Sequence, residues 1–306
     1  MSDPIIHIES VSQLHQGLGL PAPKHPLITL ISVKDVAAIK NARNEKPEPQ
    51  RYSSELYSIM LKESDCGMLY GRSHYDFEGG VLIFTAPHQV MGTSGEVDPN
   101  DNGWMLFFHP DLIRKSHLGQ HIDEYTFFSY EANEALHLSD EEEETLEQVI
   151  SKIQVEYTER IDDFSQRVMV SSLELLLNYC SRFYQRQFNT RTNQSSDVVN
   201  QVDGYIKKYF DDQLQLTEGL PSVQYFAEKV NLSANYLSDL LRKETGRALK
   251  DHINDFLIDK AKTILLNSNL SVSEIAYDLG FNYPHYFSRL FKAKTGVSPQ
   301  GYRNLN

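Results

Sequence analysis

A segment near the C-terminus occurs twice, and this duplication restricts the fold more than any other feature of the sequence. The stretches "SVQYFAEKVNLSANYLSDLLRKETG" (222–246) and "SVSEIAYDLGFNYPHYFSRLFKAKTG" (271–296) match at serine, valine, alanine, leucine, threonine and glycine positions. The offset is 49 residues before a central turn and 50 after it, so the second copy has one extra turn residue. Two copies of one small folding unit are the simplest explanation.

Each copy has the parts of a helix-turn-helix, namely a capped short helix, a turn of about four residues and a second helix that ends at glycine. Ser271 and Glu274 form a capping-box pattern in the second copy, and Gly280 suits a sharp turn because glycine accepts positive φ. Asn231 holds the turn position of the first copy, where asparagine also tolerates left-handed backbone. A helix over 249–266, about 27 Å long at 1.5 Å per residue, is expected to join the copies.

The second helix of the second copy should have one apolar face and one polar face. The apolar side chains recur at helical spacing and are expected in the core: Phe287, Leu290 and Phe291. The opposite face carries the polar side chains His285, Ser288, Arg289 and Lys292. An α-helix fits the major groove of DNA, where arginine can pair with guanine O6 and N7. A solvated surface is the ordinary explanation for a single basic helix, but the duplication favours DNA binding.

Charge is divided unevenly along the chain, whose formal net charge is -13. Residues 1–196 hold 16 Lys and Arg against 29 Asp and Glu, whereas residues 197–306 hold 13 of each group. From Leu279 onward the sequence has no carboxylate side chain beside its four cations, Arg289, Lys292, Lys294 and Arg303. This imbalance predicts a local positive surface in the C-terminal part.

The N-terminal part changes from a β pattern to a helical pattern. Up to about residue 130 there are short β-prone runs, such as 56–62, 81–86 and 104–108, separated by Gly, Pro, Asp and Asn, as is typical of a sandwich or barrel. Ser139 with Glu142 then forms a capping-box pattern, and a second helix is expected over 163–188. The broad apolar stripe of that second helix suits either a contact between subunits or a cap on the barrel.

Four ordered motifs give the C-terminal part a resemblance to a known family. The stretches "YLSDLLRKETG", "DKAKTILL", "SVSEIAYDLGF" and "YFSRLFKAKTGVSPQGYR" look like the DNA-binding domain of AraC-type bacterial transcriptional regulators. The resemblance covers residues 197–306 and implies two helix-turn-helix units that read adjacent major grooves of double-stranded DNA. It implies a sequence-specific transcriptional regulator in the cytoplasm, with activation as the commoner outcome, RNA polymerase as a further partner and no enzyme activity.

Matching positions in the motifs implies which side chains contact DNA. They are Asn235, Ser238, Asp239 and Arg242 in the first copy, Pro284, His285, Ser288, Arg289 and Lys292 in the second, and Arg303 beyond it. Asp239 is unusual on such a surface, because its carboxylate could accept from cytosine N4 or repel phosphate. Leu257 stands where the family usually has an arginine in the joining helix, so the contacts of that arginine are not carried over to this chain.

The same resemblance implies an N-terminal cupin-like β-barrel with flanking helices. The predicted architecture is a two-domain α+β chain, with an effector-binding or dimerisation domain at 1–190, a linker at 191–197 and an all-α DNA-binding domain at 198–306. The linker is placed where apolar periodicity is lost. A homodimer and a small-molecule effector are expected, without a membrane partner. The candidates for a ligand pocket lie in "VLIFTAPHQVMG" (81–92) and are His88, Gln89 and Met91.

A cupin-like enzyme that a DNA-binding tail localises is the alternative function. Cupin enzymes usually hold a metal ion through an HxH pair, a carboxylate and a later histidine, whereas His74, His88 and His109 stand singly. No catalytic residue, metal ion or cofactor is therefore expected. Seven aromatic side chains of this part could line a pocket or fill the core, and a core role is favoured: Tyr70, Phe77, Phe84, Trp104, Phe107, Phe127 and Phe128.

The cysteines and the hydropathy of the chain argue against disulfide-rich, zinc-stabilised, membrane and exported proteins. Cys66 and Cys180 are the two cysteines and lie far apart, which predicts neither a disulfide framework nor a structural zinc site, and favours a reducing compartment. The longest apolar runs fall well short of the roughly 20 residues that cross a membrane, and the first residues lack a signal-peptide pattern. An unexported protein is expected.

Overall fold

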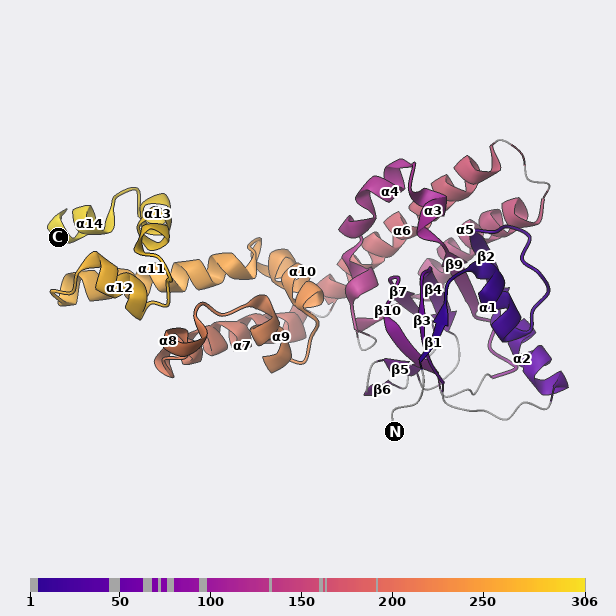
Figure 1. Ribbon diagram of the computed structural model, residues 1–306, viewed down its shortest axis with the longest axis horizontal. Helices are drawn as coiled ribbons and strands as arrows, with labels where there is room; N and C mark the ends of the chain where they lie inside the picture. The colour runs from indigo at the N-terminus through magenta and orange to yellow at the C-terminus, as the bar shows by residue number, and fades with distance from the viewer. Residues whose placement is uncertain are drawn as a thin grey trace. The chain divides into compact units, whose positions relative to one another are not determined.

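The computed structural model describes residues 5–43, 50–62, 68–70, 73–75, 80–93, 98–131, 134–159, 162, 164–190 and 192–305. They belong to two compact units, Met1–Asn189 and Thr190–Asn306, each with a hydrophobic core of its own (Figure 1). Cys66 and Phe77 lie outside the described residues. No helix in the described ranges combines the length and the apolar character that crossing a membrane requires.

The described strands all belong to the first unit. They are β1 (Ile5–Ile8), β2 (Ile28–Ser32), β3 (Gln50–Ser54), β4 (Tyr57–Lys62), β5 (Met68–Tyr70), β6 (Ser73–Tyr75), β7 (Val81–Thr85), β8 (Val90–Thr93), β9 (Trp104–Phe108) and β10 (Leu136–His137). The helices up to the unit boundary are α1 (Val11–Leu18), α2 (Val33–Ala42), α3 (Pro110–Ile113), α4 (His117–His121), α5 (Asp140–Thr158) and α6 (Ser165–Thr190), with short 3-10 helices at Ile122–Glu124 and Thr126–Ser129.

Two five-stranded sheets form the centre of the first unit. Their strand orders are β1-β3-β8-β5-β6 and β10-β7-β4-β9-β2, and β1 pairs with β3 in parallel. The other described pairs, such as β4 with β7 and β9, are antiparallel. Each sheet ends in edge strands, so the described strands form two open sheets and no closed barrel is found among them. The β-rich N-terminal part is confirmed, whereas its cupin-like form stays a prediction.

Strand β7 is buried on both faces, which explains its unbroken apolar sequence. Val81 and Ile83 join a cluster with methionine side chains of neighbouring strands, while the ring of Phe84 packs in a tilted contact on Phe127, with centroids 4.4 Å apart. The aromatic side chains favoured as core are buried wherever their exposure is described: Phe84, Trp104, Phe107, Phe127 and Phe128. Tyr70 belongs to β5.

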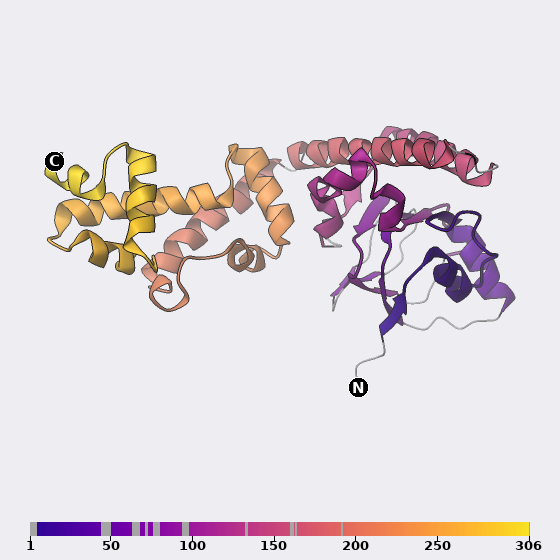
Figure 2. The same ribbon diagram turned by 45° about the horizontal axis from the view of Figure 1, so that its top comes forward.

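Helices α5 and α6 lie on one side of the strands (Figure 2). The predicted capping box begins α5, because Ser139 Oγ accepts from the Glu142 N–H and Glu142 Oε2 accepts from the Ser139 N–H. Arg186 of α6 ties the two helices together through Glu142 and donates at 2.6 Å to the carbonyl of His137. Cys180 is fully buried in α6, and burial raises the pKa of its thiol, so it is a core residue.

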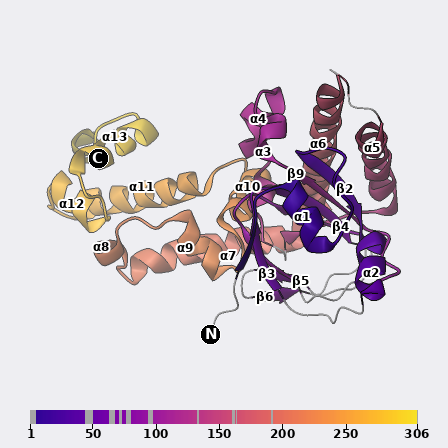
Figure 3. The same cartoon turned by 45° about the vertical axis from the view of Figure 1, so that its right-hand side comes forward.

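The second unit is entirely helical in its described part. Its helices are α7 (Thr192–Asp211), α8 (Gln215–Glu218), α9 (Val223–Lys229), α10 (Ala234–Thr245), α11 (Leu249–Asn267), α12 (Val272–Asp278), α13 (Pro284–Thr295) and α14 (Pro299–Leu305). Helix α11 joins the two helix pairs, with α10 near its N-terminal end and α12 and α13 toward the other end (Figure 3). Its side chains Leu257 and Ala261 are completely buried in the shared core.

The predicted linker differs from the structure, because α7 begins at Thr192 and residues 192–197 are helical. The loss of apolar periodicity in this segment predicts a linker. Polar residues without proline or glycine can nevertheless extend a helix whose later turns are anchored by buried Val202 and Ile206. The segment therefore belongs to the second unit as the first turns of its first helix.

Candidate nucleic-acid interface

The two sequence repeats form two helix-turn-helix units, α9 with α10 and α12 with α13. Four residues separate the first pair of helices and five separate the second pair, which confirms the predicted extra turn residue. Asn231 has φ 55° and Gly280 has φ 87°, so both predicted turn positions adopt the left-handed backbone. Ala227 and Ala276, on the first helix of each pair, are fully buried in the shared core.

The C-terminal ends of α10 and α13 are capped by the same hydrogen bonds. Thr245 Oγ1 donates to the carbonyl of Leu241 at 2.7 Å, and Thr295 Oγ1 donates to the carbonyl of Phe291 at 2.8 Å. Each hydroxyl also accepts from the backbone N–H two residues later, beyond a left-handed glycine. The repeated Thr-Gly pair is thus a structural stop signal.

Helix α13 has the two faces that the sequence predicts. Phe287 and Phe291 are fully buried and Leu290 is half-buried, which places the helix against the core. On the opposite face His285, Arg289 and Lys292 are exposed, and Ser288 is half-buried. A helix that is anchored on one face and presents two cations and an imidazole on the other can donate hydrogen bonds to base edges and phosphates.

Exposed tyrosines on this surface were missed by the sequence analysis. Tyr283 and Tyr286 are 58% and 48% exposed, and the Arg289 guanidinium lies 5.4 Å from the centre of the Tyr286 ring. The repeat pairs Tyr286 with Tyr236, which is only 4% exposed because α10 also packs against α7. Tyr286 therefore provides a cation–π contact that orients Arg289, and only the second helix-turn-helix, α12 with α13, has this contact.

Helix α10 presents a less basic surface. Asn235 is exposed, whereas the half-buried Ser238 donates its hydroxyl hydrogen to the carbonyl of Ala234 at 2.7 Å, leaving the oxygen able to accept. Asp239 lies 3.9 Å from Arg242 one helical turn later. The arginine offsets part of the charge of this carboxylate, which reduces the repulsion that a phosphate would meet.

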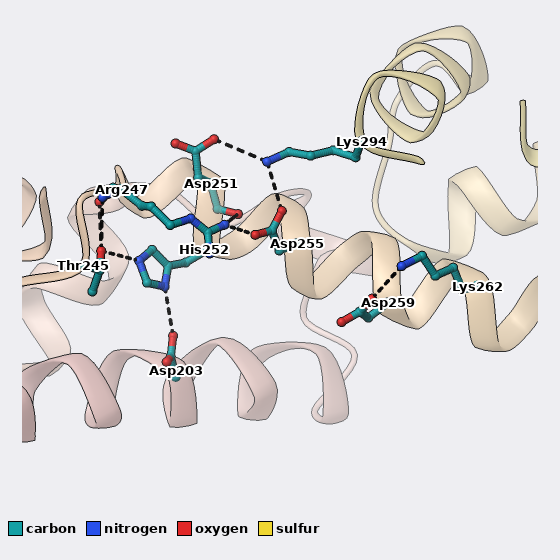
Figure 4. A network of polar contacts seen from close by, with 9 residues as sticks. All are labelled: Asp203, Thr245, Arg247, Asp251, His252, Asp255, Asp259, Lys262 and Lys294. Carbon is teal, nitrogen blue, oxygen red and sulfur yellow. Dashed lines mark hydrogen bonds and ion pairs between the residues drawn. The ribbon is translucent and has the colours of Figure 1, made fainter. Parts of the chain in front are cut away.

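The positive surface is smaller than the sequence predicts, because carboxylates of α11 lie next to one of its cations. Lys294 Nζ lies 3.0 Å from Asp255 and 3.7 Å from Asp251 of α11, and Asp255 is also paired with Arg247 (Figure 4). These carboxylates stand about 40 residues earlier in the chain, so they come close to the carboxylate-free segment only when the chain folds. Lys294 thus ties α13 to α11. The cations of α13 that have no carboxylate partner among the described residues are Arg289 and Lys292, and both are exposed.

Two further predicted contacts have structural partners. Arg303 donates from Nε to the carbonyl of Leu265 at 3.0 Å and from Nη2 to the carbonyl of Leu270 at 2.7 Å, which ties α14 to the end of α11. Pro284 is the first residue of α13, where its fixed φ and missing N–H suit helix initiation. DNA contacts by these two side chains stay predictions.

A second group of polar contacts fixes α11 to the first helix pair (Figure 4). The His252 ring lies 3.3 Å from Asp203 of α7 through Nδ1 and 3.0 Å from Thr245 of α10 through Nε2. Leu257, where the resembling family usually has an arginine, is fully buried and makes a core contact in place of a polar one.

The ligand-pocket candidates of the first unit do not gather around one cavity. Gln89 is bound to the backbone, because its amide accepts from the Ala86 N–H and donates to the Phe128 carbonyl, and Met91 is buried. His88 is exposed at φ 68° beside Glu55. A small cavity of about 10 Å³, enough for about one water molecule, is lined instead by Ile83, Phe84, Phe127, Tyr130, Glu131, Ala135 and Tyr184.

Known proteins resemble the second unit. A family model described as a helix-turn-helix domain matches residues 226–305. The HTH-type transcriptional regulator YfiF of Bacillus subtilis is 32% identical over 147 residues, which are 48% of this chain and 43% of YfiF. The Msm operon regulatory protein of Streptococcus mutans is 29% identical over 140 residues, 45% of this chain and 48% of that protein. The second unit is an AraC-type helix-turn-helix domain.

The similarity is concentrated in this AraC-type domain. The chain spans less than half the length of the two curated relatives that it matches. Among solved structures, the C-terminal domain of AraT, a response regulator from Geobacillus stearothermophilus, covers 36% of this chain and 85% of its own, with 33% identity and a TM-score of 0.32.

Proposed function

We propose that this chain is a sequence-specific DNA-binding transcriptional regulator whose two helix-turn-helix units contact adjacent major grooves. The observation that carries the proposal is the duplicated unit at the two ends of α11, each copy with one buried face and one polar exposed face on its second helix. Helix α11 has 19 residues, so it is about 28 Å long at 1.5 Å per residue. With its flanking turns this approaches the roughly 34 Å between successive major grooves on one side of DNA.

The face of α13 is expected to dominate base recognition. Arg289 is exposed and oriented by Tyr286, and His285 and Lys292 flank it without an acidic partner in the described part of the chain. The face of α10 has the mixed group Asn235, Ser238 and Asp239, which suits weaker or more permissive contacts. The two helix-turn-helix units would therefore contribute unequally to base recognition.

Selection from random duplex DNA tests this function. The full chain and residues 190–306 would be run side by side at one stated salt concentration. We expect an enriched site with two short conserved blocks about 10 base pairs apart, one block for each unit. If neither protein enriches any sequence, the proposal is wrong. If one block appears alone, only one of the two units reads DNA.

We also propose that the chain forms a homodimer through α6. Two apolar side chains of this helix are exposed, Val168 at 44% and Leu175 at 40%, and their spacing of seven residues places them on one helical face. Phe164, in the turn directly before the helix, is 67% exposed and extends this apolar surface. A second copy of the same stripe would remove this surface from water.

We further propose effector binding, activation and contact with RNA polymerase, on the basis of the family resemblance. The small cavity beside Phe84 and Tyr184 supports a ligand site in the first unit only if α6 or the 3-10 helices move to enlarge it. A thermal-unfolding screen of small apolar and aromatic compounds against the full chain would reveal such a site as a raised Tm.

A further inference from the structure

Two histidines of the first unit lie one helical turn apart on α4. His117 and His121 are the first and last residues of this helix, and their rings stack with centroids 4.2 Å apart and planes inclined by 26°. The i, i+4 spacing puts both side chains on the same side of the helix. His117 is 70% exposed as a side chain, whereas His121 is half-buried.

The other contacts of these rings leave the same atom available on each. His117 Nδ1 lies 3.1 Å from Glu174 Oε1 of α6, and His121 Nδ1 lies 3.0 Å from the carbonyl oxygen of His117. Each Nδ1–H therefore has an acceptor, and neither Nε2 has a hydrogen-bond partner within the described ranges. Metal-binding histidines commonly have this arrangement, in which a carboxylate or carbonyl fixes the tautomer and the opposite nitrogen binds the ion.

The backbone that carries the pair is held in place. Ser116 Oγ accepts from the Gly119 N–H, and Leu118 is 1% exposed, so the helix is capped and anchored between the two histidines. Gly119 has no room for a larger side chain, because an added Cβ would lie 2.2 Å from the carbonyl oxygen of Ile113. The histidines are consequently presented on a rigid turn, which lowers the cost of bringing them to one ion.

Carboxylates lie near this turn, together with the exposed cations Arg114 and Lys115 directly before it. Burial and the carboxylates of Glu174 and Glu124 raise the pKa of Tyr125, which follows α4 closely in the chain. Within the described residues no group of three or more His, Cys, Asp or Glu side chains is placed so that it could hold a metal ion. A site here would therefore use two imidazoles, with water in the remaining positions.

We propose that His117 and His121 bind one divalent transition-metal ion through their Nε2 atoms, with Glu174 as a positioning residue. The near-parallel rings must rotate out of their stack to bind, because each Nε2 lone pair lies in the plane of its own ring. Imidazole selects ions such as Zn²⁺, Ni²⁺ and Cu²⁺ over Mg²⁺, which prefers oxygen ligands. Because Glu174 belongs to α6 and the ligands belong to α4, the bound ion would strengthen the contact between these two helices. The site lies outside the helix-turn-helix units and does not depend on DNA binding.

Calorimetric titration of the untagged, metal-free full chain with Zn²⁺ tests the site. One Zn²⁺ per chain is expected, with no comparable binding of Mg²⁺, and His117→Ala or His121→Ala should each weaken Zn²⁺ at least about 10-fold. His7→Ala is the control for a competing site, because His7 and His88 both lie near Oε1 of Glu55, at 3.2 and 3.7 Å, and neither belongs to α4. It should leave the affinity unchanged.

A second measurement separates positioning by Glu174 from a merely structural role. Glu174→Gln should lower the Zn²⁺ affinity about 10-fold or more while leaving the Tm of the metal-free protein unchanged. Zn²⁺ should raise the Tm of the unmodified chain but not that of His121→Ala. The proposal is overturned if no Zn²⁺ binds, if His117→Ala binds it as well as the unmodified chain, or if His7→Ala weakens binding as much as His117→Ala does.

Discussion

Arg289 is the side chain on which sequence recognition is expected to depend most. Arg289→Ala should weaken binding to the selected DNA site by about 1–3 kcal/mol, because it removes a two-pronged contact to guanine and leaves Tyr286 without its cation. Fluorescence anisotropy at constant salt would measure the loss.

Arg289→Lys is the matched control for charge. Lysine keeps the positive charge but cannot form the planar fork, so the salt dependence of binding should be retained while discrimination against mutated sites falls. Equal affinity of the Ala variant and the unmodified chain for the selected site would exclude helix α13 as the reader of the sequence.

His25 makes the first unit sensitive to acid. It is 8% exposed, its Nδ1 accepts from the Leu27 N–H at 3.1 Å, and burial lowers its pKa from the ordinary 6.5. Below that value the unfolded chain binds a proton that the folded chain resists, so the free energy of unfolding should fall as pH falls from the ordinary pKa through the lowered one.

His25→Asn isolates this contribution, because asparagine can still accept from Leu27 but does not titrate. Urea unfolding at about pH 7.5 and about pH 5.5 should show a smaller pH-dependent loss of stability in the variant. The same loss in both proteins would mean that other groups cause it.

At the scale of elements, the turn between α12 and α13 depends on Gly280 for two reasons. Its φ of 87° is unfavourable for other residues, and an added Cβ would lie 2.9 Å from the Cβ of Gln215. Gly296 at the end of α13 has a similar φ of 81° but open space around it. Gly296→Ala should therefore cost about 1–2 kcal/mol of stability from backbone strain alone.

Gly280→Ala should cost more than Gly296→Ala, since α8 must also shift away from the turn. Urea unfolding of residues 190–306, which contain a complete core of their own, would compare the two variants. Equal losses would show that the contact with Gln215 relaxes without cost.

Short sequence patterns predict the individual helices and turns of the second unit, but they do not predict the side-chain contacts between distant parts of the chain. The capping box of Ser271 and Glu274, the left-handed turn at Gly280 and the buried face of α13 follow from residues within one or two turns of each other, and all three are confirmed. The ion pairs of Lys294 and the carbonyl contacts of Arg303 join residues more than 30 positions apart. No local pattern encodes such contacts, so the positive surface was predicted too large.

At the scale of the whole molecule, the two units differ in how far the sequence predicts them. The second unit has an internal repeat, so each position is supported by its counterpart. The first unit has none, and alternation along 81–92 could not distinguish a pocket from a turn in which the Gln89 amide is bound to the backbone. The three β-prone runs named from the sequence lie close to the bounds of β4, β7 and β9. The pairing of the strands into two open sheets depends on contacts that short runs do not specify.

Dimerisation through α6 is the prediction that concerns the whole molecule, because a dimer would present two pairs of helix-turn-helix units to DNA. Val168→Glu with Leu175→Glu places two like charges in the proposed interface and should shift the chain from dimer to monomer in analytical ultracentrifugation. Gln185→Glu, an exposed position of α6 ten residues beyond the stripe, is the control and should remain dimeric.

The same variants separate dimerisation from DNA reading. A monomeric variant should keep its affinity for a single site but lose the additional affinity for two sites on one duplex, because linked binding raises the effective concentration of the second unit. Affinity for a single site should match that of residues 190–306, since both proteins present one AraC-type domain. If the double variant stays dimeric, the exposed stripe of Phe164, Val168 and Leu175 is not the interface, and subunits must meet through another surface or not at all.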